Sequence, residues 1–201
     1  PARAYSIANT PRPDGELVLQ VARTEGGITS NWVHDHLQPG ARLTLAGAYG
    51  SFIGDPSMDT PVLCLAAGTG LAPILALTEA ALRRGFRQPV SVVFSARTQA
   101  DIYGQGLMAW WCARHPGFDY RITLTRERQH GHLAGRIRAV LPGLFSDLSK
   151  HTVFAAGSPD FVASCVTAVK ALGARPELIH TEAFFARQPP VVPDADHPLG
   201  I

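Results

Sequence analysis

Residues 65–73 read Leu65-Ala66-Ala67-Gly68-Thr69-Gly70-Leu71-Ala72-Pro73 and are the most informative segment for the fold class. It joins an apolar run to a helix-like stretch through two glycines. Glycine permits a sharp turn and lets a pyrophosphate approach the backbone, while the unpaired N–H groups at the start of the following helix stabilise its charge. Pro73 suits the first turn of that helix. The stretch predicts a strand, a turn and a helix that can bind a dinucleotide.

The motif alone leaves a structural interpretation open. Pro73 stands where the common dinucleotide fingerprint has its third glycine, and many strand–helix turns hold two glycines for geometry alone. The surrounding residues Thr60–Thr78 carry no charge and are long enough on paper to cross a hydrocarbon core of about 30 Å. Gly68, Gly70 and Pro73 interrupt this stretch. We therefore interpret it as a buried strand, a turn and the start of a helix.

The pattern of apolar and polar residues differs between the two sides of residue 57. After it, apolar runs alternate with helical stretches, which is the pattern of a doubly wound parallel sheet covered on both faces. The strands are expected at Val62–Ala66, Val90–Ser95, Tyr120–Leu124, Val153–Ala156 and Leu178–His180, with helices near Ala72–Arg84, Gly106–His115, Gly135–Val140 and Pro159–Leu172.

Before residue 57, alternation of apolar and polar residues predicts short antiparallel strands. They are expected at Arg3–Ile7, Leu17–Ala22 and Arg42–Ala46. The end of the chain, residues 187–201, is rich in proline and is expected to be a tail or linker. The sequence therefore predicts a β-rich part at 1–57, an α/β domain at 58–186 and a proline-rich tail or linker at 187–201.

Composition excludes several classes of function. The 201 residues are 46% apolar and carry a formal charge of +2, with no long basic block. No nucleic-acid stripe, polybasic membrane patch or signal peptide is indicated. The three widely spaced cysteines favour reduced thiols in the cytoplasm over disulfides or a metal site. Since the chain opens at Pro1, we expect it to be a processed or partial piece of a longer polypeptide.

Two residues at the end of the second expected parallel strand bear on the choice of nucleotide. The acidic residue that usually binds a ribose 2′-hydroxyl is missing there, and Ser95 and Arg97 occupy the region. A hydroxyl and a guanidinium can contact a 2′-phosphate, so they favour NADPH over NADH. A solvated surface arginine is the alternative.

Two motifs in the first part of the chain suggest a second phosphate-bearing cofactor. Arg3-Ala-Tyr5-Ser6 alternates along a strand, so Arg3 and Tyr5 share a face. Gly26-Gly27-Ile28-Thr29-Ser30 leads into a helix, which is a second possible phosphate site. Each motif alone is commoner as plain structure.

The order of the motifs is more informative than any one of them. Arg-x-Tyr-Ser, Gly-x-x-Ser, Gly-Thr-Gly-Leu-Ala-Pro, Gly157-Ser158-Pro159 and Glu182-Ala-Phe184 follow one another along residues 1 to about 185. Together they resemble the ferredoxin–NADP reductase superfamily. The resemblance is closest to the bacterial modules that supply electrons to oxygenases, and it extends to the module of flavohaemoglobins.

This resemblance implies an incomplete antiparallel flavin-binding β-barrel before the nicotinamide-nucleotide domain. Arg3 is then expected to neutralise the flavin phosphates, Tyr5 to pack on the isoalloxazine and Ser6 to hydrogen-bond near its N5. By the same analogy Gly27, Thr29 and Ser30 bind the pyrophosphate. The nicotinamide nucleotide is then held by Gly68, Thr69, Gly70 and Pro73, its pocket is lined by Ala156, Gly157, Ser158 and Pro159, and Glu182 and Phe184 lie by the flavin.

The function so implied is hydride transfer from NADPH or NADH to FAD, with FMN a less favoured flavin. Electrons then pass to a ferredoxin, an iron–sulfur protein or an oxygenase component. A flavohaemoglobin-like nitric oxide dioxygenase and a non-catalytic dinucleotide sensor remain open. The family often has cysteine before Gly-x-Pro, where this chain has Ala156.

Other candidate residues favour structure over chemistry. His34 and His36 diverge by about 200° on a helix, so a shared metal is not expected. Two solvated imidazoles are expected at His130 and His132, and core or interface positions at Trp110 and Trp111. No esterase or zinc-protease motif occurs.

Overall fold

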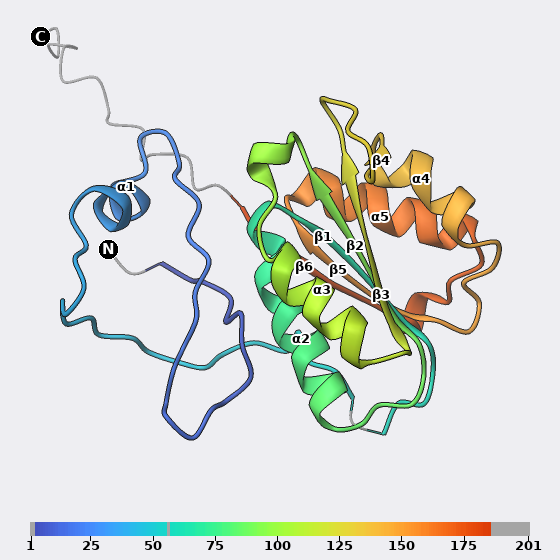
Figure 1. Ribbon diagram of the computed structural model, residues 1–201, viewed down its shortest axis with the longest axis horizontal. Coiled ribbons are helices and arrows are strands. Elements are labelled where there is room, and N and C mark those ends of the chain that lie inside the picture. The colour runs from blue at the N-terminus through green and yellow to red at the C-terminus, as the bar shows by residue number, and fades with distance from the viewer. Residues whose placement is uncertain (1–2, 56, 186–201) are drawn as a thin grey trace, which may run out of the picture.

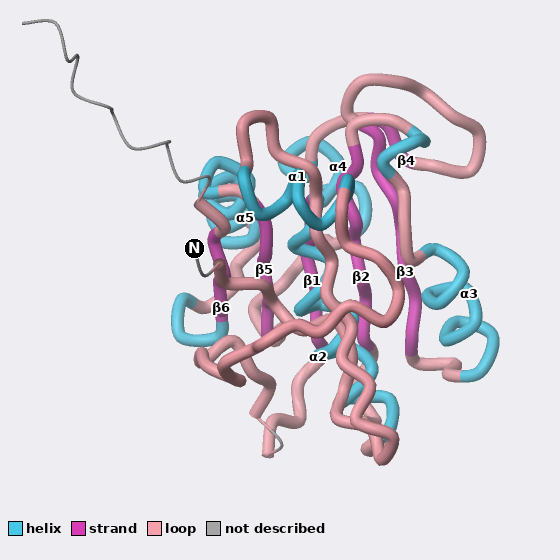
Figure 2. The backbone as a smooth tube through the Cα atoms, turned by 90° about the vertical axis from the view of Figure 1, so that its left-hand side faces the viewer, coloured by secondary structure: helices cyan, strands magenta, loops and turns pink. Residues whose placement is uncertain are grey.

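The computed structural model describes residues 3–55 and 57–185 of the chain. A six-stranded parallel sheet forms its centre, in the order β4-β3-β2-β1-β5-β6, and Figure 2 shows these strands side by side. The strands are β1 (Val62–Ala67), β2 (Val90–Ala96), β3 (Phe118–Leu124), β4 (Leu133–Ala134), β5 (Thr152–Gly157) and β6 (Ile179–Ala183).

Helices cover both faces of this sheet (Figure 1). One face packs against α2 (Leu71–Arg83) and α3 (Gln105–Arg114), and its core includes Phe94, Met108 and Trp111. The other packs against α4 (Ile137–Leu144) and α5 (Pro159–Ala171), with a core that includes Leu63 and Cys165. Short 3₁₀ turns occur at η1 (Gly68–Gly70), η2 (Gln99–Asp101) and η3 (Pro176–Leu178). The predicted doubly wound α/β fold is confirmed.

The strand order places a topological switch between β1 and β5. From β1 the chain builds outward through β2, β3 and β4, then returns to the other side of β1 with β5 and β6. Open α/β sheets bind ligands outside the carboxyl ends of the strands at such a switch. Here those ends are the Gly68–Gly70 turn and the start of α5.

Three details of the α/β part differ from the sequence prediction. The last strand was expected at Leu178–His180, but Leu178 belongs to a 3₁₀ turn and β6 continues to Ala183, because Glu182 and Ala183 pair with Ala156 and Gly157 of β5. The helix expected at Gly135–Val140 begins instead at Ile137 and includes Pro142. Its start is displaced because Gly135 donates its N–H to Leu124 O and extends the pairing of β3 with β4, a strand that was not predicted.

The antiparallel strands predicted at Arg3–Ile7, Leu17–Ala22 and Arg42–Ala46 do not form regular strands. Ile7 and Leu19 make an isolated antiparallel bridge, and Ala8 N–H donates to Val18 O. Beyond that point the Asn9 side chain takes over the backbone partners, because it accepts from Val18 N–H and donates to Glu16 O. Residues 42–46 are assigned no strand, and Leu43 and Leu45 are 50% and 61% exposed.

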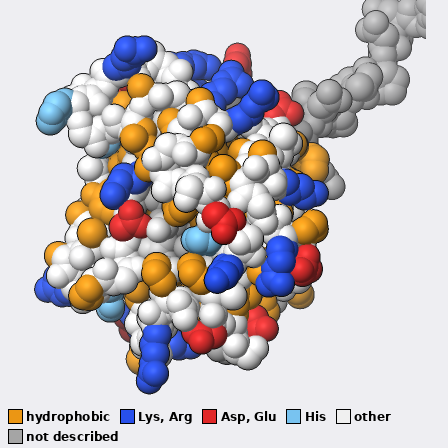
Figure 3. Space-filling view, turned by 90° about the vertical axis from the view of Figure 1, so that its right-hand side faces the viewer, with side chains coloured by type: hydrophobic (Ala, Val, Ile, Leu, Met, Phe, Trp, Pro, Cys, Tyr) orange, Lys and Arg blue, Asp and Glu red, His pale blue; other side chains and the backbone are white. Residues whose placement is uncertain are grey.

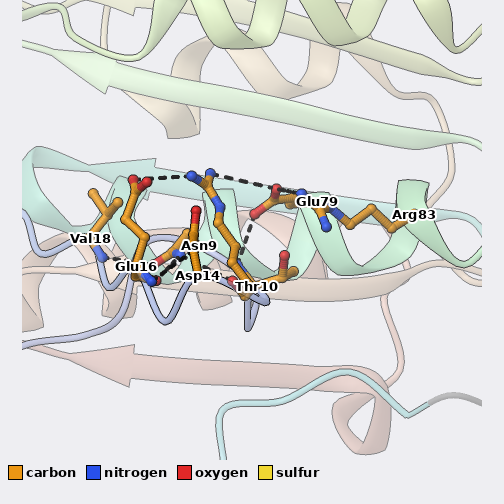
Figure 4. A network of polar contacts seen from close by, with 8 residues as sticks. Asn9, Thr10, Asp14, Glu16, Val18, Glu79 and Arg83 are labelled. Carbon is orange, nitrogen blue, oxygen red and sulfur yellow. Dashed lines mark hydrogen bonds and ion pairs between the residues drawn. The ribbon is translucent and has the colours of Figure 1, made fainter.

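A polar network fastens this first segment to α2 (Figure 4). The Glu79 carboxylate accepts the Thr10 N–H at 2.8 Å and pairs with Arg83 at 2.9 Å and with Arg12 at 3.9 Å. Burial opposes ionisation of Glu79, but the Thr10 hydrogen bonds and the two arginines hold its pKa below the ordinary value. The network therefore fixes residues 9–18 against the α/β domain.

The remaining helix, α1 (Ile28–Asp35), lies with the first segment at one side of the sheet (Figure 1). On the face shown in Figure 3, basic and acidic side chains are interspersed. Among the described residues no helix is long and apolar enough to span a bilayer. The tail expected at 187–201 lies outside the described residues.

Candidate functional site

The turn after β1 combines an open glycine with a tightly packed one. Gly68 adopts a φ of +54°, where an L side chain is strained, and a Cβ added there would meet no other atom within 4 Å. A Cβ on Gly70 would lie 2.1 Å from the Ala156 carbonyl oxygen, so this glycine permits contact between the turn and β5. The Tyr103 hydroxyl donates to Gly68 O at 2.7 Å and holds the turn in place. Gly70 is thus required by packing, whereas Gly68 leaves room for a ligand.

The helix after the turn suits an anion. α2 begins at Leu71, and the buried Pro73 is its third residue. The Leu71 N–H already donates to the carbonyl oxygens of Gly68 and Thr69, and the positive end of the α2 dipole lies at this turn. Thr69 lies half-buried in the turn itself. The glycine turn and the start of α2 thus lie where the sequence predicts a phosphate site, at the carboxyl end of β1.

A second helix begins at the same edge of the sheet. Ser158 is the N-cap of α5, and its Oγ accepts from Phe161 N–H at 3.3 Å, with Pro159 at the first helical position. A Cβ on Gly157 would lie 3.2 Å from the Ala67 carbonyl oxygen. The close approach of Gly157 to the end of β1 brings the two predicted nucleotide segments together.

The candidate 2′-phosphate residues lie at the end of β2. Ser95 is 9% exposed, in the strand, and Arg97 follows the strand. The Arg97 guanidinium donates to the Asp101 carboxylate at 2.7 Å, and this bond holds the pKa of Asp101 below its ordinary value. Thr98 and Asp101 also form a capping box around η2. Arg97 is therefore held in a defined loop by an acidic partner.

Ser6 and Glu182 meet across 176 positions of the sequence. Ser6 Oγ donates to Glu182 Oε1 at 3.0 Å, and Glu182 Oε2 is buried without a partner in the described part of the chain. Burial raises the pKa of Glu182, and the Ser6 hydrogen bond offsets part of that effect. Glu182 pairs with Ala156 in the sheet, and Phe184 N–H donates to Gly157 O at 2.8 Å. The structure thus brings Ser6, Glu182, Ala156 and Phe184 to one edge.

The second glycine-rich segment forms the predicted start of a helix. Gly27 is the N-cap of α1, and a Cβ there would lie 2.5 Å from Ser30 Oγ. The buried Ser30 hydroxyl accepts from Thr24 N–H at 3.1 Å and donates to Gly27 O at 3.3 Å. Both of these hydrogen bonds stabilise the loop that leads into α1. Thr29 lies half-buried beside it. Arg3 is exposed and Tyr5 half-buried in the bridge-forming segment.

The sequence matches the family described as the oxidoreductase NAD-binding domain over residues 64–167, about half of the chain. The chain belongs to this family. It is 31% identical over 185 residues to the ferredoxin–NAD(P)+ reductase component of the naphthalene 1,2-dioxygenase system of Pseudomonas putida. That alignment covers 92% of this chain and 56% of the relative, so the chain spans little more than half of the relative's length. The resemblance to the ferredoxin–NADP reductase superfamily is confirmed.

Solved structures of reductases have the same fold as this oxidoreductase NAD-binding chain. The Amycolatopsis cytochrome P450 reductase superposes with a TM-score of 0.82 at 31% identity, over 90% of this chain and 55% of that one. The FAD/NAD-binding domain of a Vibrio cholerae nitric oxide dioxygenase gives 0.83 at 21% identity, over 90% and 76%. The α/β domain, which begins near residue 58, makes up much less than 90% of the chain. A superposition over 90% of the chain therefore includes most of the first segment as well. That segment therefore follows the course of a reductase despite its single bridge.

Three residues of this NAD-binding chain's site were not predicted from the sequence. Tyr103 holds the Gly68 turn, Asp101 pairs with Arg97, and Glu79 anchors the first segment. Asp101 had a detectable signal, because Thr98-x-x-Asp101 fits a capping box. The partners of Tyr103 and Glu79 lie 35 and 69 positions away, so no local pattern identifies them. Within residues 3–55 and 57–185, no group of three His, Cys, Asp or Glu side chains could hold a metal ion.

Proposed function

We propose that this chain is the FAD- and NAD(P)H-binding part of an electron-transfer reductase. It takes a hydride from NAD(P)H onto FAD and passes electrons to a ferredoxin, an iron–sulfur protein or an oxygenase component. The observation that carries the proposal is the junction of Ser6 with Glu182 beside the β1–β5 switch. One edge of the sheet thereby combines a nucleotide-type turn with residues of both parts of the chain.

In this proposal the nicotinamide nucleotide lies across the carboxyl ends of β1 and β5. Gly68 offers the open approach, while Gly70, Thr69 and Pro73 shape the turn that places the positive end of the α2 dipole beside the pyrophosphate. Gly157, Ser158 and Pro159 line the nicotinamide pocket. The close approach of Gly157 to Gly70 and Ala67 supports a single continuous site.

The flavin is assigned to the first segment and its junction with β6. Arg3, Gly27, Thr29 and Ser30 bind its phosphates, with backbone N–H groups at the start of α1 as donors. Tyr5 packs on the isoalloxazine ring, and Phe184 covers the ring from the β6 side. Both aromatic side chains are half-buried, so each retains surface for a planar ligand.

The chain's own chemistry in this reaction is to position groups and to hold a proton. FAD accepts the hydride when bound, and no nucleophile from the protein is needed. Ser6 donates a hydrogen bond to Glu182, while Oε2 of that carboxyl remains without a partner. Because burial raises the pKa of Glu182, the group retains a proton to higher pH than an exposed glutamate. Ala156 supplies a methyl-lined wall opposite Glu182 in the sheet.

We assign NADPH as the preferred donor, with Ser95 and Arg97 at its 2′-phosphate. Arg97 is 64% exposed, so it can reach a phosphate while Asp101 fixes its loop. A compartment that keeps thiols reduced, the cytoplasm, fits the free Cys64, Cys112 and Cys165.

The test is the visible spectrum of the native protein before and after anaerobic addition of NADPH. We expect bound flavin absorbance that bleaches on addition of the nucleotide. NADPH binding without flavin absorbance contradicts the proposal and indicates a dinucleotide sensor. A haem spectrum in the native polypeptide indicates the flavohaemoglobin-like alternative.

A further inference from the structure

The helix α3 lies at the surface without the charged outer face that surface helices usually have. Its sequence, Gln105-Gly-Leu-Met-Ala-Trp-Trp-Cys-Ala-Arg114, holds a single charged side chain, at its last position. Met108 and Trp111 are buried in the core, and the other eight residues are exposed. Helices that are apolar on all sides are normally buried. Figure 2 shows α3 at the outside of the molecule, beside β3. The outer face of α3 is therefore an apolar surface in contact with water.

Two large side chains dominate this outer face. Leu107 is 43% exposed and Trp110 is 50% exposed. Among the described residues from 58 onward, the other exposed large apolar side chain is Phe185, at the end of the domain. The Arg114 guanidinium lies over the Trp110 ring, 4.3 Å from its centre. Tryptophan is enriched among the residues that contribute most to binding at protein–protein interfaces. The face is therefore typical of an interface.

A groove with a volume of about 560 Å³ lies beside Trp110 and is lined by residues of α2 and α3. The large apolar side chains of its wall are Leu82, Leu107, Trp110 and Trp111. The acidic and basic side chains at the groove are paired within the chain. Glu79 pairs with Arg83 at 2.9 Å. Arg12 pairs with Glu16 at 3.0 Å. Because these charges are balanced, the groove suits an apolar side chain better than a charged one.

A projecting side chain and a groove on the same surface favour a second copy of this chain as the occupant. In a dimer with two-fold symmetry the same surface of each copy faces the other, so it must hold both a projecting group and a hollow that accepts it. Trp110 is the sixth of the ten residues of α3, close to the middle of the helix. Two α3 helices that pack antiparallel about a common midpoint therefore bring Trp110 of each copy to the groove of the other.

The size and charge of the other exposed residues of α3 also permit contact between two copies. Gly106, Ala109 and Ala113 are small and exposed, so two helix backbones can approach closely. Arg114 lies about 4.5 residues from the middle of α3, which is about 7 Å along the helix. An antiparallel pair therefore separates the two Arg114 residues by about 14 Å along the helices, more than the Debye length of about 8 Å at physiological salt. Repulsion between the two guanidinium groups is thus largely screened.

We propose that α3 forms a two-fold symmetric contact between two copies of this chain. Trp110 of each copy lies in the groove between α2 and α3 of the other, and the small residues of the two α3 helices face each other across the symmetry axis. The contact does not rest on the proposed electron-transfer function, because Leu82, Leu107 and Trp110 belong neither to the nucleotide site nor to the flavin site.

Sedimentation velocity of the full chain tests the contact at protein concentrations from about 1 to about 200 µM. We expect a reversible monomer–dimer equilibrium without larger species, because a two-fold contact is closed. Trp110→Ala should weaken dimerisation at least about tenfold, since it removes the central side chain from both copies. Tyr49→Ala, which removes an aromatic side chain that is 88% exposed in the first segment, is the matched control and should leave the equilibrium unchanged. A monomer at every concentration, assembly beyond a dimer, or an effect of the control in place of Trp110→Ala overturns the proposal.

Charged variants at Ala109 test the symmetry of the contact. This residue lies next to the middle of α3, so an antiparallel pair places the two copies of it close together. Ala109→Glu and Ala109→Lys should each prevent dimerisation when studied alone, because like charges then face each other. An equimolar mixture of the two variants should associate at least about tenfold more tightly than either variant alone. Because Ala109 is exposed, both variants should unfold at the wild-type urea midpoint. Dimers of the separate variants, or a mixture that stays monomeric, contradict the antiparallel arrangement.

Discussion

Replacing Gly70 with alanine should disrupt the junction of β1 with β5. The new Cβ would lie 2.1 Å from the Ala156 carbonyl oxygen and 2.4 Å from its carbonyl carbon. Both are backbone atoms in a central strand, so no side-chain rotation can relieve the contact. Since real Cβ atoms keep at least 3.0 Å from such atoms, the turn must move by about 0.9 Å, the difference between 3.0 and 2.1 Å.

The loss in the free energy of unfolding that this shift causes can be estimated. Overpacking of a well-packed interior costs about 1–3 kcal/mol, and we expect the upper half because rigid backbone faces the new methyl. The shift also displaces Thr69 and the first N–H groups of α2. Nucleotide binding should therefore weaken together with stability.

The assay is urea unfolding followed by tryptophan fluorescence, together with titration by NADPH. Gly106→Ala in α3 is the matched control, because a Cβ there meets nothing within 4 Å. That substitution should change the free energy of unfolding by less than about 1 kcal/mol, towards greater stability. An unchanged urea midpoint and an unchanged NADPH affinity in Gly70→Ala would refute the packing argument.

Three further perturbations test other parts of the structure. The free energy of unfolding of Glu182→Gln should rise relative to that of the wild type as the pH increases above 4.5. Burial raises the pKa of Glu182, so the folded wild type holds this proton more tightly than the unfolded chain does, and that stabilisation is lost as the pH rises. Parallel curves of stability against pH would contradict this. Glu79→Ala should cost about 1–3 kcal/mol in urea unfolding, since it leaves the buried Thr10 N–H unpaired. Asp119→Ala, which breaks an exposed pair with Arg121, is the control and should cost less than about 1 kcal/mol. Arg97→Ala should raise the Michaelis constant for NADPH about tenfold and leave that for NADH unchanged, consistent with a lost charge-assisted bond; equal effects would make Arg97 structural.

The parallel sheet could be predicted because its signal is local. Strands buried on both faces appear as apolar runs, and the starts of β1, β2 and α5 agree with the predicted positions. β6 could not be placed in this way, because Thr181 and Glu182 are polar. Its position is set by pairing with Ala155 and Ala156, which no pattern within the strand reveals.

The first segment was harder to predict for a related reason. Alternation of apolar and polar residues indicates that a segment can pair, but regular pairing needs a neighbouring strand. Asn9 shows the competition directly, because its side-chain amide takes hydrogen bonds that a longer ladder would use. The alternation at residues 42–46 leaves Leu43 and Leu45 exposed instead of paired.

The strand order explains why the predicted site residues lie at one edge of the sheet. Parallel strands end at one edge, so the segments after β1, β2 and β5 meet there however far apart they lie in the sequence. Motif order could therefore predict that Gly68 and Gly157 share a site, but not which atoms touch. The contact of Gly70 with Ala156 depends on the register of β1 against β5, in which Ala66 pairs with Ala156. A one-residue change in that register would move the other face of β5 toward the turn and separate Glu182 from Ser6. Register, more than any single side chain, therefore holds the site together.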